Sequence, residues 1–438
     1  MEFYGKKLQT CSCGKKHVFP LKEILSGKGV IARLPEILKK YGLKKPFIVA
    51  DENTYAAAGK RVSEILDKNG FAFEKFLFKS ERVEPDETAI ERVENAFDKT
   101  CDLVLGIGSG VINDLCKLLA SRHERFYIIV ATAPSMDGYA SATSSMSVNG
   151  LKTSLQSKCA DVIIGDVDVL KNAPLKMLKA GLGDMLAKYV SILEWRISHE
   201  INGEYYCETV ADMIRRARDE CVKNTAGLLK REENAVKAVF DGLIVGGIAM
   251  AYAGVSRPAS GAEHYISHVI DMRGLQFGLK TELHGIQCAI ATLTCAKLYD
   301  KLKTETLTEE RGQAKTRVFS KTAWENNLRD FLGGAAEPMI ELEKKEHKYD
   351  FSRAAARRKT IIEKWETLKR IMDEELPSFS SISEILSAAD IPETFDRAGL
   401  SVDMPRTFAA TKDIRDKYVL SSLLWDLGLL DEYCDSLL

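Results

Sequence analysis

Strands and helices alternate along the first 170 residues of this 438-residue chain, and this order restricts the fold more than any other feature. Short apolar runs predict buried strands, and stretches with helical apolar spacing lie between them. Strands are expected at residues 46–50, 71–78, 103–106, 126–131 and 161–165, and helices at about 56–66, 88–96 and 111–121. This alternation favours a Rossmann-like parallel sheet with helices on both faces.

Two features mark where the alternation ends. Residues 144–148 and 152–155 flank Asn149-Gly150, a dipeptide that fits the two-residue turn of a β-hairpin. Beyond Pro174, which suits the first position of a helix, the strand signals stop and long helical stretches follow.

The chain therefore divides into two predicted domains. An α/β domain is expected at residues 1–172 and an all-helical domain at residues 173–438. Within the helical part, residues 302–375 are rich in charge, which we interpret as a solvated helical surface whose role stays open.

Composition argues against several kinds of partner. The chain has 62 basic and 63 acidic residues, so its charge does not favour nucleic acid or an anionic membrane. No apolar run approaches the roughly 18 residues that a membrane span needs. The N-terminal Met-Glu-Phe-Tyr-Gly-Lys-Lys lacks the apolar core of a signal peptide. We therefore expect a soluble, cytoplasmic protein.

A glycine-rich turn follows the strand at 103–106. The next helix opens with the phrase Gly108-Ser109-Gly110-Val111-Ile112-Asn113-Asp114. Glycine lets the backbone approach an anion closely, and a helix N-terminus offers N–H donors, so this turn suits a pyrophosphate. A plain strand–helix connection is the alternative, because the pattern is not the G-x-G-x-x-G of a standard dinucleotide fold.

Two other strand ends carry polar residues. The strand at 126–131 leads into a loop dense in hydroxyl and carboxyl groups: Thr132, Ser135, Asp137 and Ser141. Ligands bind at this end of the strands in open parallel sheets, although an ordinary polar loop is the alternative. Asp51 follows the first predicted strand, where it could bind a ribose hydroxyl and favour NADH, or cap the next helix.

Three of the seven histidines fall within 21 residues: His264, His268 and His284. Upstream, Asp184 interrupts an otherwise apolar helical stretch. One carboxylate and two imidazoles can hold a divalent metal and leave a coordination position open for chemistry. The alternatives are hydrogen-bonded core histidines and, for Asp184, a solvated ion pair with Lys188 one helical turn on.

A second motif, Cys11-Ser-Cys13-Gly-Lys-Lys-His17, has the residue types of a zinc site. The single residue between the cysteines is a strand-like spacing, and no second pair follows nearby. We therefore interpret this motif as an N-terminal strand and turn, and most of the ten cysteines as small apolar core residues.

Five phrases occur together in the order found in one known family. They are Gly108-Ser-Gly-Val-Ile-Asn-Asp114, Thr132-Ala-Pro-Ser-Met-Asp-Gly138, Gly183-Asp-Met-Leu-Ala-Lys188, Ser256-Arg-Pro-Ala-Ser-Gly-Ala-Glu-His264 and Leu283-His-Gly285. Together they resemble the bacterial type of sn-glycerol-1-phosphate dehydrogenases, which share a superfamily with iron-containing alcohol dehydrogenases and dehydroquinate synthases. The resemblance covers residues 10–300 closely and 405–430 loosely.

The resemblance implies reversible hydride transfer between NAD(P)H and dihydroxyacetone phosphate, giving sn-glycerol 1-phosphate. It also implies a homodimer and one bound divalent metal. Zinc is the preferred metal, and nickel or iron are the alternatives. The cofactor pyrophosphate would bind at Gly110–Asp114, and its nicotinamide half at Thr132, Ser135 and Ser141.

The resemblance also implies the ligands of metal and substrate. Asp184, His264 and His284 would bind the metal. Asp137, Asp184 and His268 would bind the substrate, with Asp184 and His268 as the catalytic residues.

Several alternatives stay open at this point. A polyol dehydrogenase would need no phosphate pocket, a dehydroquinate synthase-like lyase would regenerate its NAD, and a non-catalytic nucleotide-binding protein would turn nothing over. Arg257, Lys152 and Lys158 could hold a substrate phosphate, but surface charge explains all three equally well.

Overall fold

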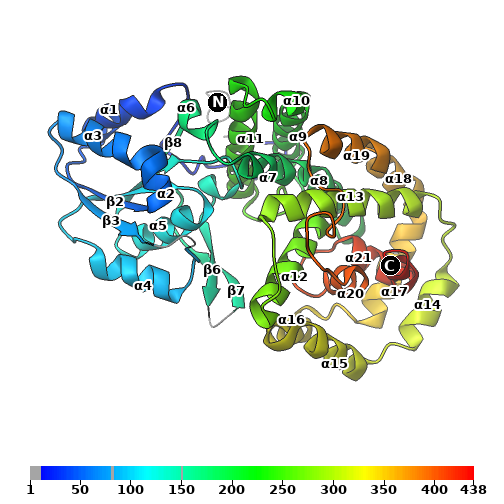
Figure 1. Cartoon of the computed structure of the whole chain (residues 1–438). Helices are drawn as coiled ribbons and strands as arrows, with labels where there is room; N and C mark the ends of the chain where they lie inside the picture. Colours follow the sequence, from blue (N-terminus) through cyan, green and yellow to red (C-terminus); the bar gives the residue numbers. More distant parts are fainter. Residues whose placement is uncertain (1–10, 80–82, 149–150) are drawn as a thin grey trace. The chain divides into compact units, whose positions relative to one another are not determined.

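The computed structural model of the chain describes residues 11–79, 83–148 and 151–438. These residues form two compact units (Figure 1). Unit 1 joins the chain up to Met185 to Asp212–Val255, and unit 2 joins Leu186–Ala211 to Ser256–Leu438. The N-terminal phrase used to argue against a signal peptide lies outside the described residues.

Unit 1 is built on a six-stranded sheet in the order β1-β8-β5-β4-β2-β3. Every neighbouring pair of strands is parallel, which confirms the predicted α/β class. The strands are β1 (Glu23–Gly27), β2 (Pro46–Asp51), β3 (Glu74–Phe78), β4 (Leu103–Gly108), β5 (Phe126–Ala131) and β8 (Val162–Asp166).

Helices cover both faces of this sheet (Figure 1). On one face, alternate residues of β4 such as Leu105 join an apolar cluster with Leu38 of α1 (Leu34–Lys40) and Val62 of α3 (Lys60–Lys68). The other face of β4 carries Gly106, against which α5 (Gly110–Arg122) packs through its Cys116. The period of two along β4 therefore places one helix layer on each side.

The predicted hairpin is present in unit 1. Strands β6 (Thr143–Val148) and β7 (Leu151–Gln156) pair antiparallel, and its turn, Asn149-Gly150, lies outside the described residues. In contrast, β1 was not predicted, because its sequence Glu-Ile-Leu-Ser-Gly holds only two adjacent apolar residues at the edge of the sheet.

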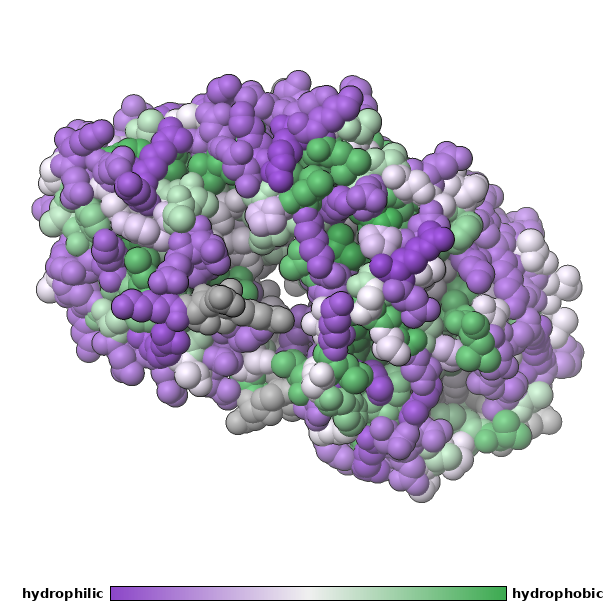
Figure 2. All heavy atoms as spheres, viewed as in Figure 1, coloured by the Kyte–Doolittle hydropathy of each residue, from purple (hydrophilic) through white to green (hydrophobic). Residues whose placement is uncertain are grey.

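Unit 1 also contains α2 (Glu52–Thr54), α4 (Glu87–Ala96), α6 (Val167–Leu170), α7 (Leu175–Leu186) up to Met185, α9 (Glu208–Lys223) from Asp212, α10 (Thr225–Leu228) and α11 (Glu233–Ala253). Among the described residues, α11 alone is long and apolar enough to cross a membrane. However, 72% of its most apolar window is buried inside the structure, as expected of a core helix. The face drawn in Figure 2 is largely hydrophilic, with hydrophobic residues scattered across it.

Unit 2 is helical throughout its described residues. Its helices are α8 (Lys188–Asn202), α12 (Ala262–Phe277), α13 (His284–Lys303), α14 (Glu309–Arg317), α15 (Lys321–Leu332), α16 (Ala336–Glu346), α17 (Phe351–Glu363), α18 (Trp365–Glu375), α19 (Phe379–Ala388), α20 (Met404–Ala410), α21 (Leu420–Leu427) and α22 (Leu430–Asp435). Helices α12 and α13, which carry the three clustered histidines, pack against each other.

Residues 302–375 are helical as predicted, but they are more than a solvated surface. Phe331, Ile361 and Met372 are buried, so α15, α17 and α18 each turn an apolar side to the core. The described residues contain no strand after β8, which ends at Asp166, although part of the helical sequence packs with unit 1. The division into domains at residues 172 and 173 therefore remains a prediction.

Close packing of α11 on β8 gives a first test of this architecture. A Cβ added at Gly165 would lie 1.9 Å from a ring carbon of Phe240, whereas one at Gly27, on the neighbouring strand β1, would meet only Val30 at 3.4 Å. We expect Gly165→Ala to lower the free energy of unfolding by roughly 1–3 kcal/mol or more, because overpacking displaces α11. Gly27→Ala is the matched control and should stay close to the parent in chemical unfolding. Equal losses would contradict the packing.

Candidate active site

The glycine-rich turn joins β4 to α5 without intervening residues other than Ser109. A Cβ at Gly108 would lie 2.5 Å from the Cβ of Ile112, so only glycine lets the helix start this close to the strand. A Cβ at Gly110 would meet only Met136, at 3.6 Å. The packing of the protein does not require glycine at position 110, and its missing side chain leaves the backbone open to a ligand.

The first turn of α5 presents N–H donors. The first intrahelical bond runs from Asn113 N to Ser109 O, 2.9 Å, so helix geometry leaves the N–H groups of Gly110, Val111 and Ile112 without intrahelical acceptors. The positive end of the helix dipole lies at the same place. This arrangement fits the predicted pyrophosphate site.

Two hydrogen bonds fix the turn to the loop after β5. Thr132 N donates to Gly108 O at 3.1 Å, and the hydroxyls of Ser109 and Ser135 share a bond of 2.6 Å. The family resemblance implied that Thr132 and Ser135 contact the cofactor. The structure places both residues beside the glycine-rich turn.

The side chains of Asn113 and Asp114 are directed into the protein. Asn113 Nδ2 donates to Gly138 O at 3.0 Å, and its Oδ1 accepts from the Tyr127 hydroxyl at 2.9 Å. Asp114 pairs with Lys117 at 2.9 Å. Burial raises the pKa of Asp114, although the Lys117 charge opposes this. A cofactor contact at these two positions therefore remains a prediction that depends on their backbone.

Lys117 is a buried cation that the sequence analysis missed. Its ammonium donates to Gly138 O at 3.2 Å, to Ser141 Oγ at 3.1 Å and to the carbonyl of Thr143. The hydroxyl of Ser141 is thus engaged within the loop as well. The sequence signal that could have revealed a buried cation was a lysine between the apolar residues Cys116 and Leu118 of this helix.

Asp51 caps the helix that follows β2, which was the alternative to a ribose contact in the sequence analysis. Its Oδ1 accepts from Thr54 N at 2.8 Å, while Asp51 N donates to Thr54 Oγ1 at 3.0 Å. Asp51 ends β2, the strand beside β4, so it lies at the same edge of the sheet as the glycine turn. One oxygen is used by the cap, and a ribose contact remains a prediction.

Asp184 and Asp137 meet within unit 1. Asp137 N donates to Asp184 Oδ2 at 3.0 Å. A Cβ on Gly181, one turn before Asp184, would lie 1.9 Å from Pro134 O, so glycine lets α7 rest directly on this loop. Asp184 and Lys188 are both fully buried, which excludes a solvated ion pair.

The three histidines gather within unit 2. His264 and His268 lie one turn apart on α12, and His284 is the first residue of α13. The ring centroids of His264 and His284 are 4.9 Å apart, and those of His268 and His284 are 5.5 Å apart in a stacked arrangement. The structure therefore brings the predicted pair of imidazole ligands together.

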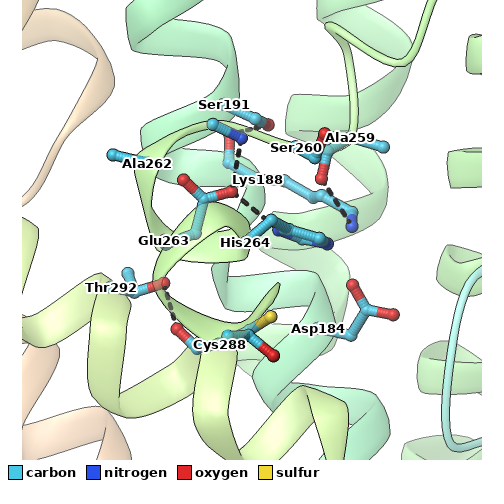
Figure 3. A network of polar contacts seen from close by, with 12 residues as sticks. Asp184, Lys188, Ser191, Ala259, Ser260, Ala262, Glu263, His264, Cys288 and Thr292 are labelled. Atoms are coloured by element: carbon cyan, nitrogen blue, oxygen red, sulfur yellow. Dashed lines mark hydrogen bonds and ion pairs between the residues drawn. The ribbon is translucent and has the colours of Figure 1, made fainter. Parts of the chain in front are cut away.

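A hydrogen bond at Nδ1 orients each of the two imidazoles. His264 Nδ1 lies 2.8 Å from Glu263 Oε1 (Figure 3). His284 Nδ1 lies 2.8 Å from Ser267 Oγ. Such partners commonly fix metal-binding histidines, because they direct Nε2 toward the ion. Neither Glu263 nor Ser267 was given a role from the sequence, although Glu263 directly precedes His264.

Cys288 is a further group that the sequence analysis assigned only to the core. Its Sγ lies 3.5 Å from His284 Nε2, and ligand atoms of His264, His284 and Cys288 lie within 4.8 Å of one another. The chemistry of this donor set, two imidazoles and a thiol, fits a divalent metal such as zinc.

Buried carboxylates surround the start of α12. Glu263 Oε1 accepts from Gly261 N at 2.8 Å, and Glu194 accepts from Ala262 N at 2.9 Å. Burial, together with the Glu263 charge, raises the pKa of Glu194 to about 8. Nearby, the Lys188 ammonium donates to Ala259 O at 3.0 Å (Figure 3).

Arg257 and Lys158, both considered for a substrate phosphate, bond within the protein. Arg257 binds Glu204 through two bonds of 2.7 and 2.6 Å and also donates to Tyr418 O. Lys158 pairs with Asp161 and donates to Arg125 O. Lys152 lies on strand β7.

Solved structures with the same fold are known dehydrogenases and reductases. Glycerol dehydrogenase from Schizosaccharomyces pombe is 17% identical, with a TM-score of 0.63 over 97% of this chain and 92% of that chain. Sulfoacetaldehyde reductase from Bifidobacterium kashiwanohense, solved with NAD+, is 14% identical, with a TM-score of 0.65 over 96% and 98% of the two chains. Residues 25–174 match the family model of iron-containing alcohol dehydrogenases.

Relatives found by sequence identify which dehydrogenases of this family the chain resembles. A glycerol-1-phosphate dehydrogenase [NAD(P)+] from Halalkalibacterium halodurans is 34% identical over 66% of this chain and 73% of its own length. One from Methanosarcina mazei is 33% identical over 64% of this chain and 76% of its own length. The chain therefore belongs to the glycerol-1-phosphate dehydrogenases of the iron-containing alcohol dehydrogenase family.

The two glycines of the turn should separate stability from cofactor binding. Gly108→Ala should lower the free energy of unfolding by roughly 1–3 kcal/mol, because its Cβ collides with Ile112. Gly110→Ala should change stability by less than about 0.5 kcal/mol but weaken NAD(P)H binding by about tenfold, since a methyl group would cover the N–H donors. Chemical unfolding and NAD(P)H fluorescence titration measure the two effects. Unchanged NAD(P)H affinity in Gly110→Ala would exclude this turn as the cofactor site.

Proposed function

We propose that the chain is a metal-dependent oxidoreductase that transfers hydride reversibly between NAD(P)H and C2 of dihydroxyacetone phosphate, giving sn-glycerol 1-phosphate. The observation that carries this proposal is the pair of Nδ1 contacts, Glu263 to His264 and Ser267 to His284. Histidines with a purely structural role would not need both Nδ1 atoms bonded so that both Nε2 atoms are directed toward an ion. The names of the sequence relatives support the choice of substrate.

Asp184, His264 and His284 are the proposed metal ligands. The carboxylate of Asp184 is held by the backbone of Asp137, and the two imidazoles are held at Nδ1. This donor set suits zinc, and nickel or iron are alternatives. When bound, such an ion acts as a Lewis acid that polarises a carbonyl group and stabilises developing negative charge on its oxygen.

Three side chains would act on the substrate. Asp137 and His268 bind its hydroxyl groups, and Asp184 contacts it while holding the metal. His268 would relay the proton that the product alcohol receives, with water as the alternative. Its ring stacks on His284, and it lies one helical turn from His264. Asp184 and His268 are thus the proposed catalytic residues.

The cofactor would bind at the carboxyl edge of the sheet in unit 1. The N–H groups that open α5, beside Gly108 and Ser109, would hold its pyrophosphate. Thr132, Ser135 and Ser141 would hold the nicotinamide half, and Asp51 would favour NADH over NADPH. Residues 1–172 would then form the cofactor domain, and residues 173–438 the metal and substrate domain. A cytoplasmic homodimer completes the proposal.

A comparison of two ketones tests the substrate. We expect dihydroxyacetone phosphate to drive oxidation of NADH or NADPH, followed by absorbance, and unphosphorylated dihydroxyacetone to do so far more slowly. Equal rates with the two ketones would remove the phosphate from the proposal and favour a polyol dehydrogenase. No oxidation with either ketone would favour a lyase or a nucleotide-binding protein.

Replacing one metal ligand tests the metal. His264→Ala should lose the metal of this site and most of the turnover, because one imidazole of the donor set is gone. His199→Ala, which removes an exposed imidazole on α8, is the matched control and should keep both. Metal is measured by elemental analysis and turnover by NAD(P)H oxidation. Full activity of a metal-free His264→Ala protein would overturn the mechanism.

A further inference from the structure

The geometry points to a second metal site in unit 1, formed by Cys11, Cys13 and His17. We propose that these residues bind a zinc ion that stabilises the protein and takes no part in hydride transfer. Residues 11–14 form the predicted turn, and the first strand among the described residues is β1 at Glu23, beyond the motif.

The ligand atoms of the three side chains are already close. They lie within 4.8 Å of one another, and Cys13 Sγ is 3.3 Å from His17 Nε2. Zinc bonds of about 2.3 Å to sulfur and about 2.0 Å to nitrogen place tetrahedral ligand atoms roughly 3.5–3.8 Å apart. Only small movements separate the observed arrangement from a loaded site.

The turn is shaped to direct both thiols to one side. Gly14 has φ of +79°, and its N–H donates to Cys11 O at 3.1 Å. A Cβ at Gly14 would meet nothing within 4 Å, so backbone conformation alone explains this glycine. Lys15 N donates to Cys13 Sγ at 3.5 Å, a contact that stabilises a thiolate.

His17 has the orientation of a metal ligand. Its Nδ1 lies 2.9 Å from Tyr252 O, so an Nδ1–H group donates to that carbonyl and Nε2 is left as the ligand atom. The ring is buried, with 5% of the residue exposed. Tyr252 lies on α11, so a metal held by His17 would tie the N-terminal segment to a core helix of the same unit.

The segment around the motif lacks secondary structure, so a bound metal would stabilise it. Residues 11–22 form neither helix nor strand, and no backbone hydrogen bonds of a helix or sheet hold this segment in place. Two thiolates and an imidazole form a soft donor set that prefers zinc to magnesium or calcium. The site supplies three ligands, and water or another side chain completes the tetrahedron.

Metal content of the intact protein and of single variants tests the site. We expect about two metal ions per parent chain and about one in Cys13→Ser, because metal binding at a cysteine site needs its thiolates. Cys13→Ser should keep NAD(P)H oxidation, since the motif does not take part in the reaction. Cys159→Ser is the matched control, because Cys159 is also a partly exposed thiol of unit 1. It should keep both ions.

Cobalt substitution tests the ligands without relying on the folding of a cysteine variant. Cobalt-loaded His264→Ala should still show the near-ultraviolet charge-transfer band of cobalt bound to thiolates. Its histidine site is disabled, so Cys288 cannot account for the band. Chelation should also lower the unfolding temperature of His264→Ala, because loss of a bound ion removes its stabilisation.

Two results of the metal experiments would overturn the proposal. They are the same metal content in Cys13→Ser and Cys159→Ser, and no thiolate band in cobalt-loaded His264→Ala. A disulfide between Cys11 and Cys13 in the purified protein, found by thiol titration, would also overturn it. Loss of the metal at His264 and His284 alone leaves this site intact, so the two metal proposals fail separately.

Discussion

The pairing of β4 with β5 determines where the candidate cofactor residues Ser109, Thr132 and Ser135 lie. Gly108 stands opposite Ala131 in this ladder, so Ser109 and Thr132 leave the sheet together. The bond from Thr132 N to Gly108 O extends the ladder by one step, and the bond between the hydroxyls of Ser109 and Ser135 continues it. A one-residue slip would turn every side chain to the opposite face, so buried Leu105 and Ile128 fix the register and with it the candidate site.

Lys117 connects the carboxyl edge of the sheet to the loop that follows Asp137, through hydrogen bonds to that loop. An isolated ammonium would be costly to bury, but this one has three oxygen acceptors and the Asp114 carboxylate around it. Those acceptors belong to Gly138, Ser141 and Thr143, so Lys117 holds the loop to α5 together with the bond from Asn113 Nδ2 to Gly138 O. The position of Asp137, and through its N–H that of Asp184, therefore depends on a buried lysine in a helix that starts at the cofactor turn.

The sequence predicted the parts of this protein whose signals are local. The alternation of short apolar runs with helical stretches, and the long helical stretches after Pro174, were sufficient for the fold. Strand β1 was missed because an edge strand needs little apolar sequence. Asp184 and the clustered histidines stood out as polar residues in apolar helices.

What the sequence could not supply is the partner of each polar group. Asn113 and Ser141 were predicted to face a cofactor because of their position in a motif, yet both side chains bond within the protein. Glu263 and Ser267 gained a role only when folding placed them at Nδ1 of the histidines. His17 meets Tyr252, 235 residues away, and no spacing rule along the chain could reveal that contact.

Charge balance connects these carboxylates to the proposed metal. A divalent ion at the proposed site would be neutralised by two carboxylates, Asp184 as the proposed ligand and Glu263 behind His264, so a third ionised carboxylate beside them would be unfavourable. Glu194 is that third group, and its pKa of about 8, raised by burial and by the Glu263 charge, keeps it protonated at neutral pH. Because this pKa lies above the unfolded value, the stability it contributes is complete in acid and is lost as the pH rises through about 8. Deprotonation of Glu194 at alkaline pH would therefore leave a second buried negative charge beside Glu263.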